Sequence, residues 1–401
     1  MKKIGLLPKL IIAIVLGILL GSFLPDWAVR VLTTYNYIFA QFINFAVPLI
    51  IVAFVAPGIA DLGDGAGKTL AITAGIAYVS TLIAGSLAYG ANALLLPKIL
   101  DPASLTNFSA STAEGLKTYF EVNIPPIFGV MTALILAFLL GIGMAAVNSK
   151  SMKSVADEFQ AIIASVIKNF IIPLLPLHIL GIFANMTFNG QVAAVLSVFI
   201  RVFALVLVLH LLMLVLQFTI AGVLNGVNPL RLMKNMIPAY LTAIGTQSSA
   251  ATIPITLAQT RKNGVQENIA EFTVPLCATI HLSGSTITLV SCSIAMMMIH
   301  GMNFQFAVFF PFIMALGVTM IAAPGVPGGA VMAALGLLAS MLGFTEPMIA
   351  LMIALYMAQD SFGTACNVTG DGAIALIMNK ISGHRLEWMP KTKMKEDLIT
   401  D

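Results

Sequence analysis

Charged residues are scarce in this sequence: Asp, Glu, Lys and Arg make up only 9% of its 401 residues, whereas 59% are hydrophobic. A soluble globule needs many more charged side chains to cover its surface. The composition therefore predicts an all-α integral membrane protein that is surrounded by membrane lipid and crosses the bilayer several times. The net charge is only +3, and the basic residues gather at the chain ends and in a few loops, so we expect no nucleic-acid partner.

Cysteine is equally rare. The three cysteines, Cys277, Cys292 and Cys366, lie in apolar segments, and none belongs to a C-x-x-C motif. Isolated cysteines in apolar surroundings are typical of small packing residues. We therefore expect no disulfide framework.

The sequence is instead rich in apolar runs of about 20 residues, the length needed to cross a bilayer core about 30 Å thick. These runs predict eight spanning helices, at 6–24, 37–59, 69–96, 125–147, 155–188, 192–216, 269–297 and 347–378. The polar stretch 98–121 is predicted to be an extracellular loop.

Two further apolar stretches are interrupted halfway. The stretch 233–260 contains GTQSSAATIP at 245–254, and the stretch 304–342 contains APGVPGG at 323–329. Each half is short for a crossing, so both stretches are predicted to be re-entrant helical hairpins whose tips stop inside the membrane. Paired broken segments indicate inverted repeats and a transporter substrate site near the midplane. A spanning helix kinked at proline is the alternative for either stretch.

The distribution of basic residues predicts the orientation. With both termini cytoplasmic, fifteen of the twenty Lys and Arg residues fall on the inner side, and Arg30, Lys98 and Lys117 fall on the outer side. This asymmetry fits the positive-inside rule. We expect a cell membrane location, in bacteria the inner membrane.

The last span carries the clearest functional signal, QDSFGTACNVTGD at 359–371. At 100° per residue, four polar side chains fall within a wedge of about 60° on one helix face: Asp360, Thr364, Asn367 and Asp371. Ionisable groups at membrane depth usually pair with each other, with an ion or with a substrate. This face therefore predicts a binding site.

The hairpin tips offer complementary groups. Half-helices that end inside a membrane leave backbone N–H groups that attract a carboxylate and carbonyls that attract a cation. Ser248 and Ser249 add hydroxyls at the first tip, and glycines such as Gly328 allow close backbone approach at the second. These groups suit a zwitterion together with a cation.

The seventh span contains its own polar cluster, TIHLSGS at 279–285. Its polar residues alternate, and a regular helix cannot aim such residues at one cavity, so we predict local unwinding at Gly284. His281 is equally consistent with a buried histidine bonded to a carbonyl and with a role in ion coordination or proton coupling.

Four motifs resemble, in order, those of the dicarboxylate/amino acid:cation symporter family, the glutamate-transporter homologues. They are SSAATIP at the first tip, PLCATIHLSG in the seventh span, PGVPGG at the second tip and DSFGTACNVTGD in the last span. The resemblance covers nearly the whole chain and is strongest from Gln247 onward. SSAATIP and the run Gln359-Asp360-Ser361 are most similar to the sodium/serine-threonine symporter branch.

The resemblance implies roles for individual residues. Asp360 matches the aspartate that takes the substrate ammonium, and Asn367 matches the amide that holds the substrate carboxylate. The implied substrate residues are Asp360, Thr364, Asn367, Ser248, Ser249, Gln247, Ser285, Gly363, Val326 and Gly328. The implied ligands of two sodium sites are Asp371, Asn367, Cys277, His281, Thr279, Ile321 and Ala323. Carboxylate, amide and carbonyl oxygens suit a small hard cation.

Departures from the family pattern narrow the expectation. Members that carry acidic substrates have an arginine at the position of Gly363 or of Gln247. This chain has no arginine at either position, so no guanidinium group is present there to bind a second carboxylate through two hydrogen bonds. We therefore expect a small neutral amino acid: serine, threonine or alanine. The family typically has Asn and Asp where this chain has His281 and Ser283, so a third sodium site is expected to be lost, although Ser80 and Thr81 still line its remnant. One or two sodium ions then accompany each substrate.

The resemblance further implies a homotrimer with an elevator mechanism. Residues 1–66 and 122–190 are assigned to the scaffold, residues 67–97 and 191–380 to the transport domain, and residues 381–401 to a cytoplasmic tail. The predicted function is sodium-coupled symport. A proton-coupled or exchange-only carrier of neutral amino acids or a related small carboxylate is the alternative. An intramembrane enzyme is not expected, because Asp360 and Asp371 lie about 16 Å apart along their helix, too far to share a proton.

Overall fold

The computed structural model describes residues 6–63, 67–100, 116–190, 192–321, 323 and 327–387. These residues form helices and no strand, so the all-α prediction is confirmed for them. The helices are α1 Leu6–Phe23, α2 Asp26–Gly63, α3 Gly67–Ile99, α5 Val130–Val147, α6 Lys150–Val166, α7 Ile172–Phe188, α8 Val192–Asn225, α9 Pro229–Asn235, α10 Ile237–Thr246, α11 Ser249–Lys262, α12 Glu267–Ile280, α13 Ser283–Ile299, α14 Phe306–Ile321, α15 Gly329–Leu342 and α16 Glu346–Ile381. Most of the predicted loop 98–121 lies outside the described residues.

Six helical segments among the described residues are long and apolar enough to cross a membrane: Asp26–Ala60, Thr69–Ile99, Lys150–Phe188, Val195–Asn225, Glu267–Ile299 and Glu346–Ile381. The segment Lys150–Phe188 joins α6 to α7 through a π-helical turn at Ile167–Ile171. The predicted spans 6–24 and 125–147 form the shorter helices α1 and α5.

Some helices exceed their predicted spans. Helix α2 begins at Asp26 rather than at residue 37, and α8 continues to Asn225 rather than ending at residue 216. Hydropathy marks only the apolar portion of a helix, whereas backbone hydrogen bonding continues through polar turns at its ends. The length of the apolar run therefore underestimated the length of both helices.

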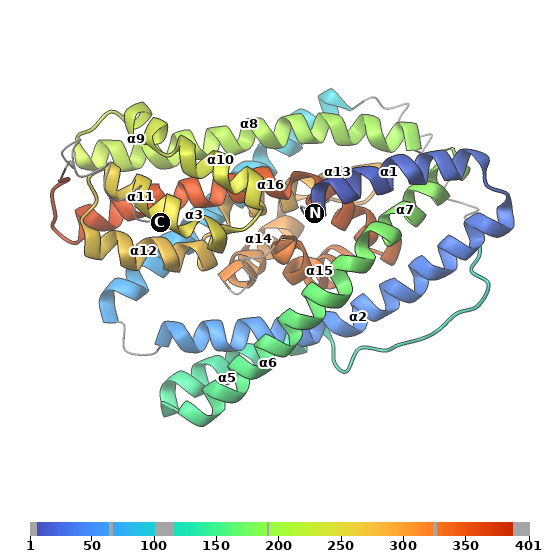
Figure 1. Cartoon of the computed structure of the whole chain (residues 1–401), viewed down its shortest axis with the longest axis horizontal. Coiled ribbons are helices and arrows are strands. Elements are labelled where there is room, and N and C mark those ends of the chain that lie inside the picture. Colours follow the sequence, from blue (N-terminus) through green and yellow to red (C-terminus); the bar gives the residue numbers. More distant parts are fainter. Residues whose placement is uncertain are drawn as a thin grey trace, which may run out of the picture.

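The helices pack in two groups. In the first, α1 packs against α7, and α2 packs against α5, α6 and α7. Small residues permit close approach here, because a side chain at Gly17 would meet the Leu180 carbonyl and one at Gly141 would meet the Ala56 carbonyl. Figure 1 shows α5 and α6 beside α2, on the side of the molecule opposite α8.

The second group surrounds α16. This helix packs against α8, α10, α11, α12, α13 and α15, and α3 packs against α13. Figure 1 shows α8 running alongside this assembly. In an apolar stretch of 18 residues, 89% of the residues are buried in α16 and 94% are buried in the segment Glu267–Ile299. Both elements are therefore enclosed by protein.

Both predicted hairpins are interrupted near the expected positions. In the first, α10 ends at Thr246 and α11 begins at Ser249, so only Gln247 and Ser248 separate the helices. The predicted interruption 245–254 was too long, since Pro254 lies inside α11. In the second hairpin, α14 ends at Ile321 and α15 begins at Gly329.

The seventh span is also broken, but the prediction of unwinding at Gly284 is wrong by a few residues. Helix α12 ends at Ile280, the non-helical residues His281 and Leu282 follow, and Gly284 lies in the first turn of α13. Gly284 is small because it packs closely on α16: a Cβ there would lie 2.5 Å from the Gly363 carbonyl oxygen.

Candidate functional site

The polar face of α16 lies inside the protein. Asp360, Thr364, Asn367 and Asp371 are exposed by 4%, 6%, 2% and 0%, respectively. The helix is continuous from Glu346 to Ile381, so the four side chains share a face, as their spacing predicts. Buried carboxylates require compensating donors or cations, and the partners of each therefore indicate its capacity to bind a ligand.

Asp360 meets the second hairpin tip. Its Oδ2 accepts a hydrogen bond of 2.7 Å from the backbone N–H of Gly328. Gly328 has φ 75°, a left-handed conformation that favours glycine, and it precedes the first turn of α15. The carboxylate thus lies at a helix N-terminus, where backbone N–H groups stabilise negative charge. Val326, expected in the same site, lies outside the described residues.

Asn367 caps α13. Its Oδ1 accepts from the backbone N–H groups of Gly284 at 2.8 Å and Ser285 at 3.3 Å, and its Nδ2 donates to the Ser285 hydroxyl at 3.0 Å. The N-cap residue Leu282 makes no capping hydrogen bond through its side chain, so an amide from another helix satisfies the first N–H groups of α13. This contact explains why a new helix can begin after His281.

Gly363 faces the same first turn. A Cβ at Gly363 would have its nearest contact with the Ser285 backbone nitrogen at 3.6 Å, an ordinary van der Waals distance. The space beside this residue is therefore bounded by α13. The position contributes no charge.

The first tip lies against α16, because α10 and α11 both pack on that helix. Gln247 has φ 53° and ends α10, and the Ser248 hydroxyl accepts from the Ala251 N–H at 3.3 Å at the start of α11. Ser249 is buried. All three predicted residues thus lie at helix ends, where backbone groups can lack partners within the helix, and Gln247 and Ser248 are partly exposed.

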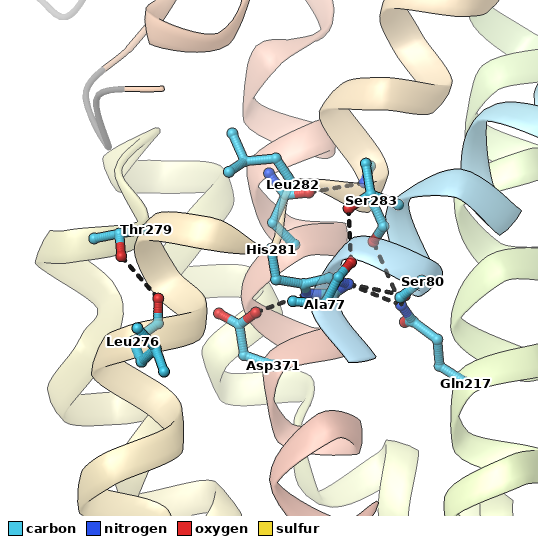
Figure 2. Close-up of polar contacts among 12 residues, drawn as sticks. Ala77, Ser80, Gln217, Leu276, Thr279, His281, Leu282, Ser283 and Asp371 are labelled. Carbon is cyan, nitrogen blue, oxygen red and sulfur yellow. Dashed lines mark hydrogen bonds and ion pairs between the residues drawn. The ribbon is translucent and has the colours of Figure 1, made fainter. Parts of the chain in front are cut away.

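Asp371 has a different environment, shown in Figure 2. Its Oδ1 lies 2.9 Å from Nδ1 of His281. The other imidazole nitrogen, Nε2, lies 3.1 Å from the Ser80 hydroxyl and 3.2 Å from Nε2 of Gln217. Gln217 Nε2 also donates to the hydroxyls of Ser80 and Ser283. The extended backbone at His281 thus lets its ring join groups from α3, α8 and α16.

The other predicted sodium ligands differ in their surroundings. Cys277 is buried, and its carbonyl accepts from the His281 N–H at 2.8 Å. Thr279 lies apart from the Asp371 cluster in Figure 2, and its hydroxyl donates to the Leu276 carbonyl at 2.8 Å. Ile321 ends α14 and Ala323 is buried just beyond it. The structure therefore does not bring Thr279 to Asp371, and the assignment of two sodium sites stays a prediction.

Two polar residues of this core were missed in the sequence. Gln217 is one of a few polar residues in the mainly apolar helix α8, a signal that often marks a buried contact in membrane proteins. Tyr356, one turn before Asp360, is fully buried, and its hydroxyl lies beside Asp360 and Ser285 without a hydrogen-bond partner among the described residues. In the sequence, Tyr356 cannot be distinguished from an aromatic residue that only packs in the core, so no pattern marked it as part of a site.

The charge of the core has one sign. Asp360 and Asp371 are buried, whereas no Lys or Arg in the described part of the chain is buried. Within those residues there is also no cluster of three or more His, Cys, Asp or Glu side chains placed to hold a metal ion. The arrangement suits a cationic group at Asp360 and an oxygen-bound cation at Asp371.

A buried polar core inside apolar helices defines the class, a multi-pass membrane protein. The family model of the "Sodium:dicarboxylate symporter family" matches residues 6–381. The chain therefore belongs to this family, whose members are transporters and not enzymes. Family membership also indicates sodium-coupled symport of amino acids.

The chain is similar to a glutamate symport protein and to serine/threonine transporters. The "Proton/sodium-glutamate symport protein" of Bacillus caldotenax is 26% identical over 99% of both chains. The "Serine/threonine transporter SstT" of Acinetobacter baumannii is 27% identical over 92% of this chain and 95% of that protein. The protein of the same name from Streptococcus suis is 25% identical over 82% of this chain and 94% of that protein.

Proposed function

We propose that this protein is a secondary active transporter that carries a small neutral amino acid, serine, threonine or alanine, together with sodium. The observation that carries the proposal is Asp360, a buried carboxylate whose described hydrogen-bond partner is the neutral backbone N–H of Gly328. A substrate ammonium supplies the missing positive charge. Asn367, Ser285 and the backbone of the first tip are proposed to receive the substrate carboxylate. The other residues proposed for the substrate site are Thr364, Ser248, Ser249, Gln247, Gly363, Val326 and Gly328.

Selectivity for neutral substrates follows from the lack of a buried cation. No Lys or Arg of the described chain is buried, and Gly363 and Gln247 stand where acidic-substrate relatives place arginine. A substrate with a second carboxylate would therefore bury that charge without a partner, at a cost of several kcal/mol. A hydroxymethyl or methyl side chain carries no such cost.

Sodium is proposed to bind at Asp371. The Oδ2 atom of this carboxylate is buried and accepts no hydrogen bond from the described residues, which suits a hard cation. Asn367 and the carbonyls of Cys277 and His281 are proposed to complete this site, and Thr279 with carbonyls at Ile321 and Ala323 a second. The His281 ring, held by Ser80 and Gln217, fills the space of a third site, so one or two sodium ions accompany each substrate.

Transport is proposed to occur by an elevator motion in a homotrimer in the bacterial inner membrane, with both termini cytoplasmic. The packing of α1, α2, α5, α6 and α7 as one group supports a scaffold at 1–66 and 122–190. The packing of α3 and α8–α16 around the polar core supports a transport domain at 67–97 and 191–380. The two hairpins are proposed to belong to inverted repeats and to close the site from opposite sides.

The test uses proteoliposomes with an inward sodium gradient. We expect accumulation of labelled serine or alanine, no accumulation of aspartate, and no uptake when potassium replaces sodium. Strong aspartate uptake would overturn the selectivity argument. Uptake that persists without sodium and collapses with the pH gradient would favour proton coupling, and uptake that requires internal amino acid would favour exchange. A thermal-shift screen of neutral amino acids with and without sodium reports binding independently of transport.

A further inference from the structure

A cavity of about 480 Å³ lies where the two helix groups meet. One wall comes from α2 and α7, including Tyr37 and His178, and the other comes from the N-terminus of α16, including Glu346. The remainder of the lining is mixed: it includes the aliphatic side chains of Ile182 and Leu351 and the polar side chains of Thr118, Asn185 and His300. The cavity contains none of the residues assigned to substrate or sodium, and its volume is typical of sites for small organic ligands.

Glu346 supplies a positioned negative charge in this cavity. Its Oε1 accepts hydrogen bonds from Gln41 Nε2 at 2.8 Å and Asn44 Nδ2 at 2.7 Å, both on α2. The carboxylate stands in the first turn of α16, where the helix dipole stabilises an anion. Its Oε2 accepts no hydrogen bond from the residues that the structure describes. One carboxylate oxygen thus remains for a ligand.

His178 supplies a donor. The side-chain amide of Asn36 has partners for both of its atoms in one orientation. In this orientation the oxygen accepts from the Ile182 N–H at 2.9 Å, and the nitrogen donates to His178 Nδ1 at 3.1 Å. A neutral ring then carries its proton on Nε2. His178 is only 2% exposed, and Nε2 has no partner among the described residues. Buried polar atoms of this kind are rarely left unpaired.

The two groups face a common space. A gap of about 10 Å³, room for one water molecule, is lined by both His178 and Glu346 beside the larger cavity. Glu346 is the one carboxylate among the lining residues, and no Lys or Arg is among them. A metal ion does not fit, because the described residues hold no group of three metal-binding side chains.

We propose that this cavity binds a small organic amine that carries a hydroxyl next to the amine and has an apolar body. The ammonium group pairs with Glu346 Oε2, the hydroxyl oxygen accepts from His178 Nε2, and the apolar body packs on Tyr37 and the aliphatic wall. This ligand lacks the carboxylate of an amino acid and binds outside the polar core. It contacts both helix groups at once.

The binding test uses the full-length protein in detergent and the probe 2-amino-1-phenylethanol, measured by isothermal titration calorimetry. Two analogues each remove one interaction: 1-phenylethane-1,2-diol lacks the amine, and 2-phenylethylamine lacks the hydroxyl. We expect the loss of the amine to weaken binding about 30-fold or more and the loss of the hydroxyl about fivefold. Equal affinity of the diol and the probe would overturn the proposal without any change to the protein.

Protein variants locate the site. Glu346→Gln should weaken probe binding at least about tenfold, whereas Glu267→Gln, a matched change at an exposed residue paired with Arg261, should leave it unchanged. Saturating serine should not displace the probe. Displacement by serine, or equal binding to Glu346→Gln and the unchanged protein, would place the probe elsewhere. This binding assay does not depend on transport, so its failure is distinguishable from failure of the proposed function.

Discussion

Asp360 and Asp371 lie about three turns apart on the same face of α16, but different groups compensate them. Asp360 accepts from a backbone N–H of the second hairpin, a neutral donor. Asp371 pairs with the imidazole of His281, whose far nitrogen is held by Ser80 and Gln217. The region of Asp360 thus lacks a cation until a ligand arrives, whereas the region of Asp371 contains a side chain that takes one carboxylate oxygen. We infer that substrate binding depends chiefly on Asp360. We also infer that His281 reduces the number of sodium ions that bind near Asp371.

The difference follows from what packs against each end of the face. Asp360 lies opposite a hairpin tip, where helix ends provide backbone groups and no charged side chain. Asp371 lies opposite continuous parts of α3 and α8 and the break between α12 and α13, where side chains fill the space. A site made of backbone groups can open for a ligand, whereas a side-chain network is costly to disrupt.

The largest expected effect is from Asp360→Asn. Removing the carboxylate leaves the substrate ammonium buried without a charged partner, which costs about 2–5 kcal/mol, or roughly 30-fold or more in affinity. Labelled serine uptake into proteoliposomes should fall to background. Asp157→Asn, at an exposed aspartate of α6, is the matched control and should retain uptake. Normal uptake by Asp360→Asn would show that the carboxylate is only structural.

A smaller effect is expected from Asp371→Asn. The amide keeps the size of the side chain but removes its charge, so sodium binding should weaken by about 1.5–3 kcal/mol, or roughly tenfold or more. The sodium concentration for half-maximal serine uptake should rise accordingly, while uptake at high sodium persists. An unchanged sodium dependence would contradict the assignment of sodium to this residue.

His281→Asn tests the contribution of the imidazole. A shorter side chain leaves the Asp371 carboxylate buried without its partner, which should lower stability by about 1–3 kcal/mol in the absence of sodium. Added sodium should restore part of the melting temperature, because the freed oxygen binds the cation. His210→Asn is the control, since His210 is also buried but contacts the Gly284 carbonyl and the Thr288 hydroxyl. If sodium stabilises both variants equally, His281 does not take the place of an ion.

The last comparison is at the contact between α13 and α16 that separates the two regions, where Gly363→Ala is expected to have the smallest effect of all. Gly284→Ala places a Cβ 2.5 Å from the Gly363 carbonyl and should destabilise the protein by about 1–3 kcal/mol. Gly363→Ala, on the opposite side of the same contact, meets no atom closer than 3.6 Å and should leave the melting temperature nearly unchanged. A larger fall in melting temperature for Gly363→Ala than for Gly284→Ala would mean that there is no free space beside Gly363.

Much of the fold was predictable because it depends on local patterns. Apolar runs marked the helices, and short polar or glycine-rich interruptions marked the hairpins, since only helices satisfy the backbone in a membrane. The position of the break in the seventh span was not predictable. It lies at His281–Leu282 because Asn367 of α16 caps the first turn of α13, a contact between segments distant in the sequence.

The sequence by itself determined the membrane class, the shared face of Asp360, Thr364, Asn367 and Asp371, and the lack of an arginine at Gly363 or Gln247. These features depend on composition, on the helical repeat and on residue identity, all of which are local. Only the tertiary structure decided which groups each carboxylate meets: the Gly328 N–H at Asp360, and His281 with Gln217 at Asp371. A helical repeat fixes the direction of a side chain on its own helix, whereas its partner depends on how separate helices pack.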